Sequence, residues 1–283
     1  MKIEDGCNCF CSYCIIPYAR GRVRSRSIEN IIREAEMLAG NYKEIVLTGI
    51  NLTAYGRDTG NNLADVVHAV ASVEGIERVR LGSIEADFIT PEMLAAFAAE
   101  PKFCPQFHLS LQSGCDATLK RMNRHYTVAD YTALVDKIRE LFDNPSITTD
   151  VIVGFPGETD DDFEQSLEFV RSIGFTKIHC FIFSAREGTV AYSLPDQVPP
   201  EKKNERAAKL QHLAAEAAEN FMQSQLGVEQ EIVAEREAGD GLWEGFTRNY
   251  TAVHFRGSCE RGGIYRVIAD SVCGDHCVGH IVD

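Results

Sequence analysis

Four cysteines stand close together near the start of the chain, Cys7, Cys9, Cys11 and Cys14. Thiolates are preferred ligands of soft metal centres, and three of these, in the pattern Cys7-x-x-x-Cys11-x-x-Cys14, can converge on one centre. A [4Fe–4S] cube needs four ligands. A loop of three cysteines would therefore hold such a cube with one iron open to a small molecule.

A zinc site and a redox-active Cys-x-x-Cys pair are the alternatives for this loop. Zinc requires a fourth Cys or His, and none follows within twenty residues after Cys14. Cys9 could formally serve, but tetrahedral sites rarely use four such crowded neighbours, so we do not count Cys9 as a ligand. Gly6 before the first cysteine and Tyr13 before the last favour the iron–sulfur interpretation.

Strand-like and helix-like segments alternate after the cysteine loop. The hydrophobic pattern predicts strands at residues 1–4, 43–49, 78–81, 106–111, 147–153 and 177–183. It predicts helices between them at residues 28–38, 63–73, 93–99, 128–142 and 159–172. Such alternation is typical of an α/β fold with a parallel sheet covered by helices, which brings functional loops together at its carboxyl edge.

The C-terminal quarter of the chain has a different pattern. A long helix rich in Ala, Glu and Lys is expected over residues 199–226, and short extended runs separated by glycine turns follow it. These runs, at residues 230–234, 242–247, 252–255, 264–269 and 278–282, predict a small antiparallel β-barrel. We therefore expect two domains, residues 1–221 and residues 222–283.

Composition sets limits on the protein class. The 283 residues are 45% hydrophobic and 25% charged, as in globular proteins, with neither an apolar run long enough to span a membrane nor a signal-peptide pattern. We expect a cytoplasmic protein with no membrane partner, in which ten cysteines do not form structural disulfides. The net charge of −14 argues against a non-specific nucleic-acid binder. A local basic run is the exception: Arg20, Arg22, Arg24 and Arg26.

Several segments resemble one enzyme family. Residues 6–21, Gly-Cys-Asn-Cys-Phe-Cys-Ser-Tyr-Cys-Ile-Ile-Pro-Tyr-Ala-Arg-Gly, resemble the signature loop of radical S-adenosylmethionine (SAM) enzymes, and more narrowly that of the tRNA methylthiotransferases. Residues 18–26 and 47–51 resemble the branch that acts on threonylcarbamoyladenosine, whereas the isopentenyladenosine and ribosomal-protein branches look different there. Leu-Gln-Ser-Gly at 111–114 and Gly-Phe-Pro-Gly-Glu-Thr at 154–159 also match the family, and the likeness extends over the whole chain.

The resemblance implies a partial (β/α)6 radical SAM barrel followed by a TRAM-like, RNA-binding β-barrel. It implies a [4Fe–4S] cluster whose open iron chelates SAM, and a 5′-deoxyadenosyl radical formed when an electron from a donor such as flavodoxin or ferredoxin cleaves the sulfonium bond. In this family the radical takes a hydrogen from C2 of N6-threonylcarbamoyladenosine, next to the anticodon of tRNA. A sulfur held on a second cluster is methylated and inserted there.

The resemblance also assigns candidate roles. Cys7, Cys11 and Cys14 would hold the cluster. SAM would be bound by the residues at the loop and strand ends, namely Tyr13, Gly49, Ser83, Glu85, Gln112, Ser113, Arg124, Val153 and Phe183. RNA would be bound by the basic run and a turn of the second domain, namely Arg20, Arg22, Arg24, Arg26 and Arg248. Taken singly, these positions also fit ordinary turn glycines, helix caps, solvated arginines and core aromatics.

The chain departs from the family pattern in two respects beyond Cys9. Family members carry an N-terminal domain with three more cysteines for the second cluster. Because the first predicted strand begins at residue 1, we expect a fragment that cleaves SAM but does not complete methylthiolation. Residues 222–283 hold five basic and ten acidic side chains, which disfavours strong RNA binding by that domain alone. The rival hypotheses are another methylthiotransferase branch and a non-catalytic RNA-binding fragment with a structural cluster.

Overall fold

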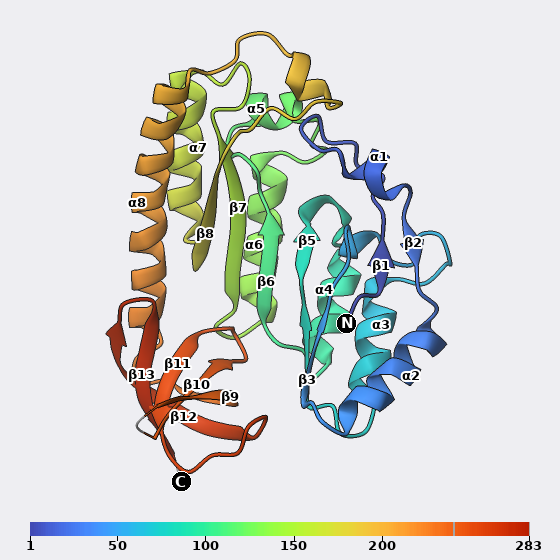
Figure 1. Cartoon of the computed structure of the whole chain (residues 1–283), viewed down its shortest axis with the longest axis vertical. Helices are drawn as coiled ribbons and strands as arrows, with labels where there is room; N and C mark the ends of the chain where they lie inside the picture. The colour runs from blue at the N-terminus through green and yellow to red at the C-terminus, as the bar shows by residue number, and fades with distance from the viewer. Residues whose placement is uncertain (240, 283) are drawn as a thin grey trace.

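A curved sheet of parallel strands forms the N-terminal part of the computed structural model, which describes residues 1–239 and 241–282 (Figure 1). Residues 1–3 bond in parallel to the segment after β3 (Glu44–Leu47), through Ile3 N to Thr48 O at 2.9 Å. β3 pairs with β4 (Arg78–Leu81), and a bridge from Val79 to Phe103 links β4 to the segment before β6. The remaining parallel strands are β5 (Ser83–Glu85), β6 (Gln106–Ser110), β7 (Ser146–Val153) and β8 (Lys177–Ile182). The predicted parallel sheet is confirmed.

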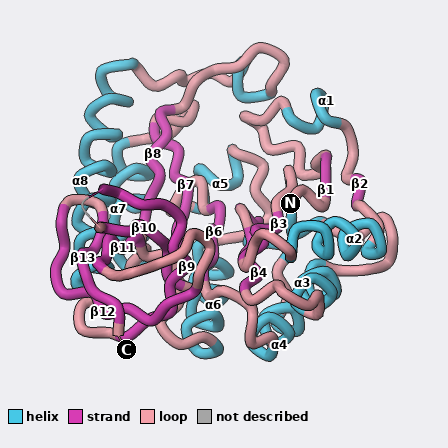
Figure 2. Tube along the Cα trace, turned by 60° about the horizontal axis from the view of Figure 1, so that its bottom comes forward, coloured by secondary structure: helices cyan, strands magenta, loops and turns pink. Residues whose placement is uncertain are grey.

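Helices lie around the outside of these strands (Figure 2). The long ones are α2 (Ile28–Ala39), α3 (Leu63–Ala71), α4 (Pro91–Ala99), α6 (Val128–Leu141), α7 (Asp160–Ile173) and α8 (Pro200–Ser224). Ser27, Thr90, Thr127 and Thr159 each accept a backbone hydrogen bond at the start of a helix, which fixes where it begins. Apolar faces of these helices pack on the outward side chains of the strands and form the main core.

Short elements shape the ends of the sheet. They are β1 (Glu4–Asp5), α1 (Ile16–Arg20), β2 (Arg24–Ser25), α5 (Asp116–Arg121) and the 3₁₀ turns η1 (Leu52–Ala54), η2 (Ala86–Phe88) and η3 (Val190–Ser193). β1 and β2 pair antiparallel, with Glu4 opposite Ser25. This pairing brings the basic run back beside the strand that leads into the cysteine loop.

The C-terminal strands close into a five-stranded barrel. They are β9 (Glu229–Gly239), β10 (Leu242–Thr247), β11 (Ala252–Arg256), β12 (Ile264–Cys273) and β13 (His276–Ile281), in the order β10-β11-β13-β12-β9. The prediction of a purely antiparallel barrel is wrong at one place, because β11 and β13 pair in parallel. The reason is topological. β13 lies between β11 and β12 in the barrel and is the antiparallel hairpin partner of β12. Its other edge pairs with β11, and there the two strands run in the same direction.

Two buried arginines fasten this barrel to the sheet. Arg78 and Arg80 of β4 are 0% and 2% exposed and both contact the Glu44 carboxylate. Arg78 donates to the carbonyl oxygens of Phe246 and Thr247, at 3.3 Å and 2.9 Å. Because Arg78 is the first residue of its strand, the barrel lies at the amino ends of the parallel strands. The cysteine loop follows β1 and lies at the carboxyl ends, the opposite end of the molecule in Figure 1.

The helix α8 connects the two parts and ends at Ser224, three residues beyond the predicted domain boundary. Met222 packs against the core of the C-terminal barrel. The division into domains at residues 221 and 222 stays a prediction.

Candidate functional site

The cysteine loop is held in place by backbone hydrogen bonds at both ends and in the middle. Cys7 N donates to Gly21 O at 3.0 Å, Cys14 N to Cys11 O at 2.9 Å, and Ser12 N to Met122 O at 3.0 Å. The four loop thiols are partly buried and free of disulfide bonds. The fold thus presents Cys7, Cys11 and Cys14 together on one anchored turn.

Nitrogen donors point at the loop sulfurs. Asn51 Nδ2 lies 3.1 Å from Cys9 Sγ and 3.8 Å from Cys7 Sγ. Arg124 Nη1 lies 3.3 Å from Cys11 Sγ. Such donors stabilise the anionic thiolate, the form that binds metal. Sequence reasoning missed Asn51, although the family-like run 47–51 contained the signal.

The loop thiols differ in acidity. A hydrogen bond from the Cys9 thiol, acting against burial, lowers the pKa of Cys7 to about 6. Burial raises the pKa of Cys11 and of Cys14 in this structure. The same hydrogen bond between Cys9 and Cys7 raises the pKa of Cys9. The contact between the two thiols therefore favours the thiolate at Cys7 over the thiolate at Cys9.

Arg124 and Glu85, both predicted to bind SAM, form an ion pair beside the loop. The Arg124 side chain is 3% exposed and that of Glu85 is 22% exposed. Arg124 Nε also donates to the Tyr126 hydroxyl at 3.2 Å. The arginine thus links a strand-end carboxylate to the sulfur of Cys11.

The turn after β3 rests on a buried carboxylate. Glu4 Oε2 accepts from the backbone N–H groups of Ile50 and Asn51, both at 2.8 Å. A side chain at Gly49 would place its Cβ 2.7 Å from that oxygen, so a larger residue at this predicted position would push the carboxylate away from the two N–H groups. Burial raises the pKa of Glu4 to about 7. The sequence carried no specific signal for Glu4 beyond its place in the first strand.

A cavity of about 190 Å³ lies at the carboxyl ends of β7 and β8. Its lining includes three predicted residues, Tyr13, Gln112 and Phe183. Val153 is not among them, because its side chain is buried in the main core. Alternation along β7 places Ile152 in the cavity instead, together with Phe181 of β8. The role of Val153 in binding SAM stays a prediction.

Ser83 and Ser113 have other surroundings. Ser83 Oγ lies 3.2 Å from Ser110 Oγ, and Ser83 lines a second cavity of about 500 Å³ that reaches the C-terminal barrel. Ser113 is 2% exposed, and its hydroxyl accepts from the backbone of Cys115. The structure does not bring these two hydroxyls into the smaller cavity.

The basic run forms an exposed edge next to the loop. Arg20, Arg22 and Arg24 are exposed, and the Arg22 guanidinium lies over the Phe10 ring, 5.1 Å from its centroid. Arg24 and Arg26 have protein partners: Arg24 donates to the carbonyl oxygens of Arg20 and Arg22 and lies 3.7 Å from Asp5, and Arg26 pairs with Glu34 at 2.6 Å. Arg20 and Arg22 are therefore the best placed of the four to meet a ligand in solution.

The remaining predicted arginine has structural partners. Arg248 donates to the carbonyl oxygens of Pro101 and Phe103, at 2.6 Å and 2.7 Å, across the junction of sheet and barrel. Its role in RNA binding stays a prediction, and its observed contacts fasten the two parts together.

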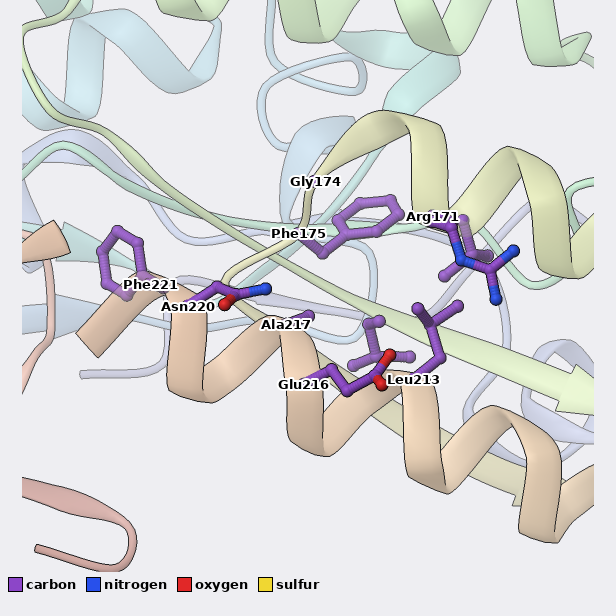
Figure 3. Close-up of a pocket in the computed structure, with 10 residues that line it drawn as sticks. Arg171, Gly174, Phe175, Leu213, Glu216, Ala217, Asn220 and Phe221 are labelled. Atoms are coloured by element: carbon purple, nitrogen blue, oxygen red, sulfur yellow. The ribbon is translucent and has the colours of Figure 1, made fainter. Parts of the chain in front are cut away.

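A third hollow, of about 410 Å³, lies between α7 and α8 and is drawn in Figure 3. Arg171, Phe175, Leu213 and Glu216 are among its lining residues. None of the predicted site residues borders it.

Over residues 1–239 and 241–282, we also find no helix that combines the length and apolarity needed to cross a membrane.

Most of this chain is similar in sequence to known proteins. Residues 1–170 match the model of the Radical SAM superfamily. The chain is 43% identical over 260 residues to a threonylcarbamoyladenosine tRNA methylthiotransferase, MtaB, of Thermotoga maritima, covering 91% of this chain and 60% of that protein. It is also 43% identical over 264 residues to a tRNA-2-methylthio-N(6)-dimethylallyladenosine synthase of Caldicellulosiruptor saccharolyticus, covering 92% and 56%. The chain thus spans about 60% or less of the length of these relatives.

Solved structures share the fold at low sequence identity. The radical SAM methyltransferase TsrM of Kitasatospora setae superposes with a TM-score of 0.58 at 17% identity, over 68% of this chain and 38% of that one. Coproporphyrinogen III oxidase, HemN, of Escherichia coli superposes with a TM-score of 0.57 at 16% identity, over 78% of this chain and 52% of that one. The resemblance inferred from the cysteine loop is confirmed. Because the family match covers both that loop and most of the strands behind it, the chain belongs to the radical SAM superfamily.

Proposed function

We propose that this chain is the SAM-cleaving core of a tRNA methylthiotransferase. The observation that carries the proposal is the anchored turn that presents Cys7, Cys11 and Cys14 at the carboxyl end of a parallel sheet. Functional loops of such sheets gather at that edge. The similar proteins are named as enzymes that methylthiolate tRNA, and they supply the reaction class.

The residues of the loop fit a [4Fe–4S] cluster. Its donor set is three free thiols with N–H groups directed at their sulfurs. Within the described part of the chain, no three loop sulfurs lie within 4.8 Å of one another, as the ligands of a single zinc ion would. Cys7, Cys11 and Cys14 would hold the cluster. When bound, it supplies the electron that cleaves the sulfonium carbon–sulfur bond of SAM.

The surrounding side chains have binding and shielding roles. Glu4 fixes the backbone of the 49–51 turn, which would lie against the amino end of SAM. The Glu85–Arg124 pair offers a carboxylate for hydroxyl or ammonium groups and a guanidinium for a carboxylate. Tyr13, Ile152 and Phe183 line an apolar wall of the small cavity and would exclude water from a reactive intermediate.

The substrate we propose is N6-threonylcarbamoyladenosine next to the anticodon of tRNA, modified at C2. Residues 18–26 and 47–51 support this branch, whereas overall identity does not separate it from the dimethylallyladenosine branch, since relatives of both are 43% identical. The exposed arginines Arg20, Arg22 and Arg24 lie beside the loop and would contact the tRNA backbone. The C-terminal barrel is proposed as a TRAM-like module, and a flavodoxin or ferredoxin as the electron donor.

Reductive cleavage of SAM tests the core activity. We would reconstitute the full chain anaerobically with iron and sulfide, add dithionite and SAM, and measure 5′-deoxyadenosine by liquid chromatography. The Cys11→Ala variant is expected to form none, and Cys259→Ala, which changes a thiol outside the loop, is expected to match the unmodified chain. Equal product from Cys11→Ala would reject the cluster.

Analysis of modified nucleosides tests the substrate. In a strain that lacks the whole gene, mass spectrometry of tRNA nucleosides is expected to show threonylcarbamoyladenosine without its 2-methylthio group. Persistence of that group, together with loss of 2-methylthio from the isopentenyladenosine nucleoside, would reassign the protein to the other branch.

A further inference from the structure

Three polar side chains meet inside the sheet, away from the cysteine loop. They are His108 of β6, Asp150 of β7 and His179 of β8. Their neighbours along the strands, such as Phe107, Val151 and Ile178, are buried against the helices, so the three side chains face the opposite, inner side. Three adjacent parallel strands therefore hold the trio on rigid backbone.

The ligand atoms of this trio are close enough to share one ion. A nitrogen of each histidine and an oxygen of Asp150 lie within 4.8 Å of one another. His108 Nε2 lies 3.2 Å from Asp150 Oδ2. Zinc–ligand bonds of about 2.0–2.1 Å place tetrahedral ligands about 3.3 Å apart. The measured spacing thus matches two ligands of one metal ion.

The other nitrogen of His108 has its own partner. His108 Nδ1 lies 2.8 Å from the Thr148 hydroxyl. In one tautomer of His108 the Thr148 hydroxyl donates to Nδ1 and Nε2–H donates to Asp150; in the other, Nδ1–H donates to Thr148 and the lone pair of Nε2 faces the carboxylate, so that a metal ion can lie between them. Metal-binding histidines are commonly oriented by such a second hydrogen bond. Thr148 is therefore suited to orient His108 as a ligand.

The trio borders open space: both histidines line the cavity of about 500 Å³, and Asp150 lines the smaller cavity near Tyr13. Room therefore remains for water or a substrate oxygen to complete the coordination.

We propose that His108, Asp150 and His179 form a mononuclear site for a divalent transition-metal ion inside the sheet, separate from the cysteine loop. Two imidazoles and one carboxylate suit zinc(II) or iron(II) and leave coordination positions open. The site lies between the cavity that reaches the C-terminal barrel and the one beside the proposed SAM site. The inference does not depend on the proposed function, because its readout is metal binding rather than catalysis.

Zinc is the probe for the test. The full chain, its loop already filled by anaerobic iron–sulfur reconstitution, is incubated with zinc, desalted and measured by mass spectrometry for metal content. We expect about one zinc per chain and, by zinc X-ray absorption, only nitrogen and oxygen ligands at about 2.0–2.1 Å. No retained zinc, or a sulfur shell at about 2.3 Å, would overturn the proposal.

Variants locate the ion. Loss of an outer hydrogen-bond partner typically weakens metal affinity by about 10–100-fold. We expect Thr148→Val to weaken zinc affinity by that factor, and His108→Ala and His179→Ala to weaken it more. Thr148→Val keeps all three ligands, and His179→Ala removes the trio's most exposed member. Far-ultraviolet circular dichroism and loop iron content establish that each variant is folded.

A second histidine pair serves as the matched control. His254 and His276 stack with ring centroids 3.8 Å apart on the C-terminal barrel. His254→Ala is expected to bind zinc like the unmodified chain. Zinc binding that survives His108→Ala and His179→Ala, or that disappears in His254→Ala, would refute the site in the sheet.

Discussion

Arg124 donates a hydrogen bond to the sulfur of Cys11 at 3.3 Å, although 113 residues separate the two in sequence. The same guanidinium pairs with Glu85. One buried side chain therefore connects the cysteine loop, the end of β5 and the turn after α5. The arrangement at the carboxyl edge depends on contacts between segments that are distant along the chain.

Removing this arginine is expected to destabilise the fold. Arg124→Met leaves the mostly buried Glu85 carboxylate without its partner, and breaking such pairs costs about 3–5 kcal/mol. Urea unfolding of the metal-free chain measures the change. Arg33→Met, on the exposed face of α2, is the control and is expected to stay within about 0.5 kcal/mol. An Arg124→Met variant as stable as the unmodified chain would contradict the importance of this ion pair.

Cys9 is expected to be dispensable for the cluster. Its thiol donates to Cys7, so the two sulfurs occupy neighbouring space and Cys7 carries the negative charge. Cys9→Ala should therefore retain its iron and labile sulfide after anaerobic reconstitution. Cys7→Ala, Cys11→Ala and Cys14→Ala should each lose most of theirs. Iron loss in Cys9→Ala equal to that in Cys11→Ala would make Cys9 a ligand.

Glu4 is expected to make stability depend on pH. Burial raises its pKa in the folded chain to about 7 from 4.5, so the folded state binds the proton more tightly than the unfolded state does. Its stabilising contribution is full at pH values below 4.5 and is lost as pH rises through 7.

Glu4→Gln removes that titration and keeps an oxygen for the Ile50 and Asn51 amides. As pH rises from about 5 to about 8, the free energy of unfolding of this variant should increase by roughly 1–3 kcal/mol relative to that of the unmodified chain. Urea unfolding at several pH values measures this, with the exposed Glu36→Gln as control. A stability difference that does not change with pH would show that Glu4 does not titrate as described.

The junction between sheet and barrel is expected to depend on Arg78. Arg78→Met removes its hydrogen bonds to Phe246 and Thr247 and leaves the Glu44 carboxylate with one partner fewer. We expect the free energy of unfolding to fall by about 3 kcal/mol or more. We also expect faster proteolytic cleavage between α8 and β9, which gel electrophoresis measures. Unchanged cleavage there would mean that other interactions, such as those of Arg248, suffice.

The exposed arginines are expected to set the salt dependence of tRNA binding. Removing one arginine that neutralises a phosphate lowers the slope of log affinity against log salt by about 1. Arg20→Gln and Arg22→Gln should each do so in filter-binding measurements. Arg26→Gln is the matched contrast, because Arg26 is paired with Glu34 and should change the slope less. Equal slopes for all variants would remove the basic edge from the RNA interface.

Local sequence determined much of this protein. The spacing of Cys7, Cys11 and Cys14 and the alternation of strands and helices depend on neighbouring residues, so the loop, the parallel sheet and five C-terminal strands could be predicted. Alternation along β7 also places Val153 and Ile152 on opposite faces of the sheet, and Ile152 is the one that lines the cavity.

Tertiary structure alone decided which distant side chains meet. The carboxylate of Glu4 under Gly49, the guanidinium of Arg124 on Cys11 and the grouping of His108, Asp150 and His179 join segments tens of residues apart. The parallel pairing of β11 with β13 and the placement of Arg248 at the junction arise in the same way. Hydrogen bonds and ion pairs act over a few ångströms in space, and their partners are fixed only once the sheet and the barrel have closed.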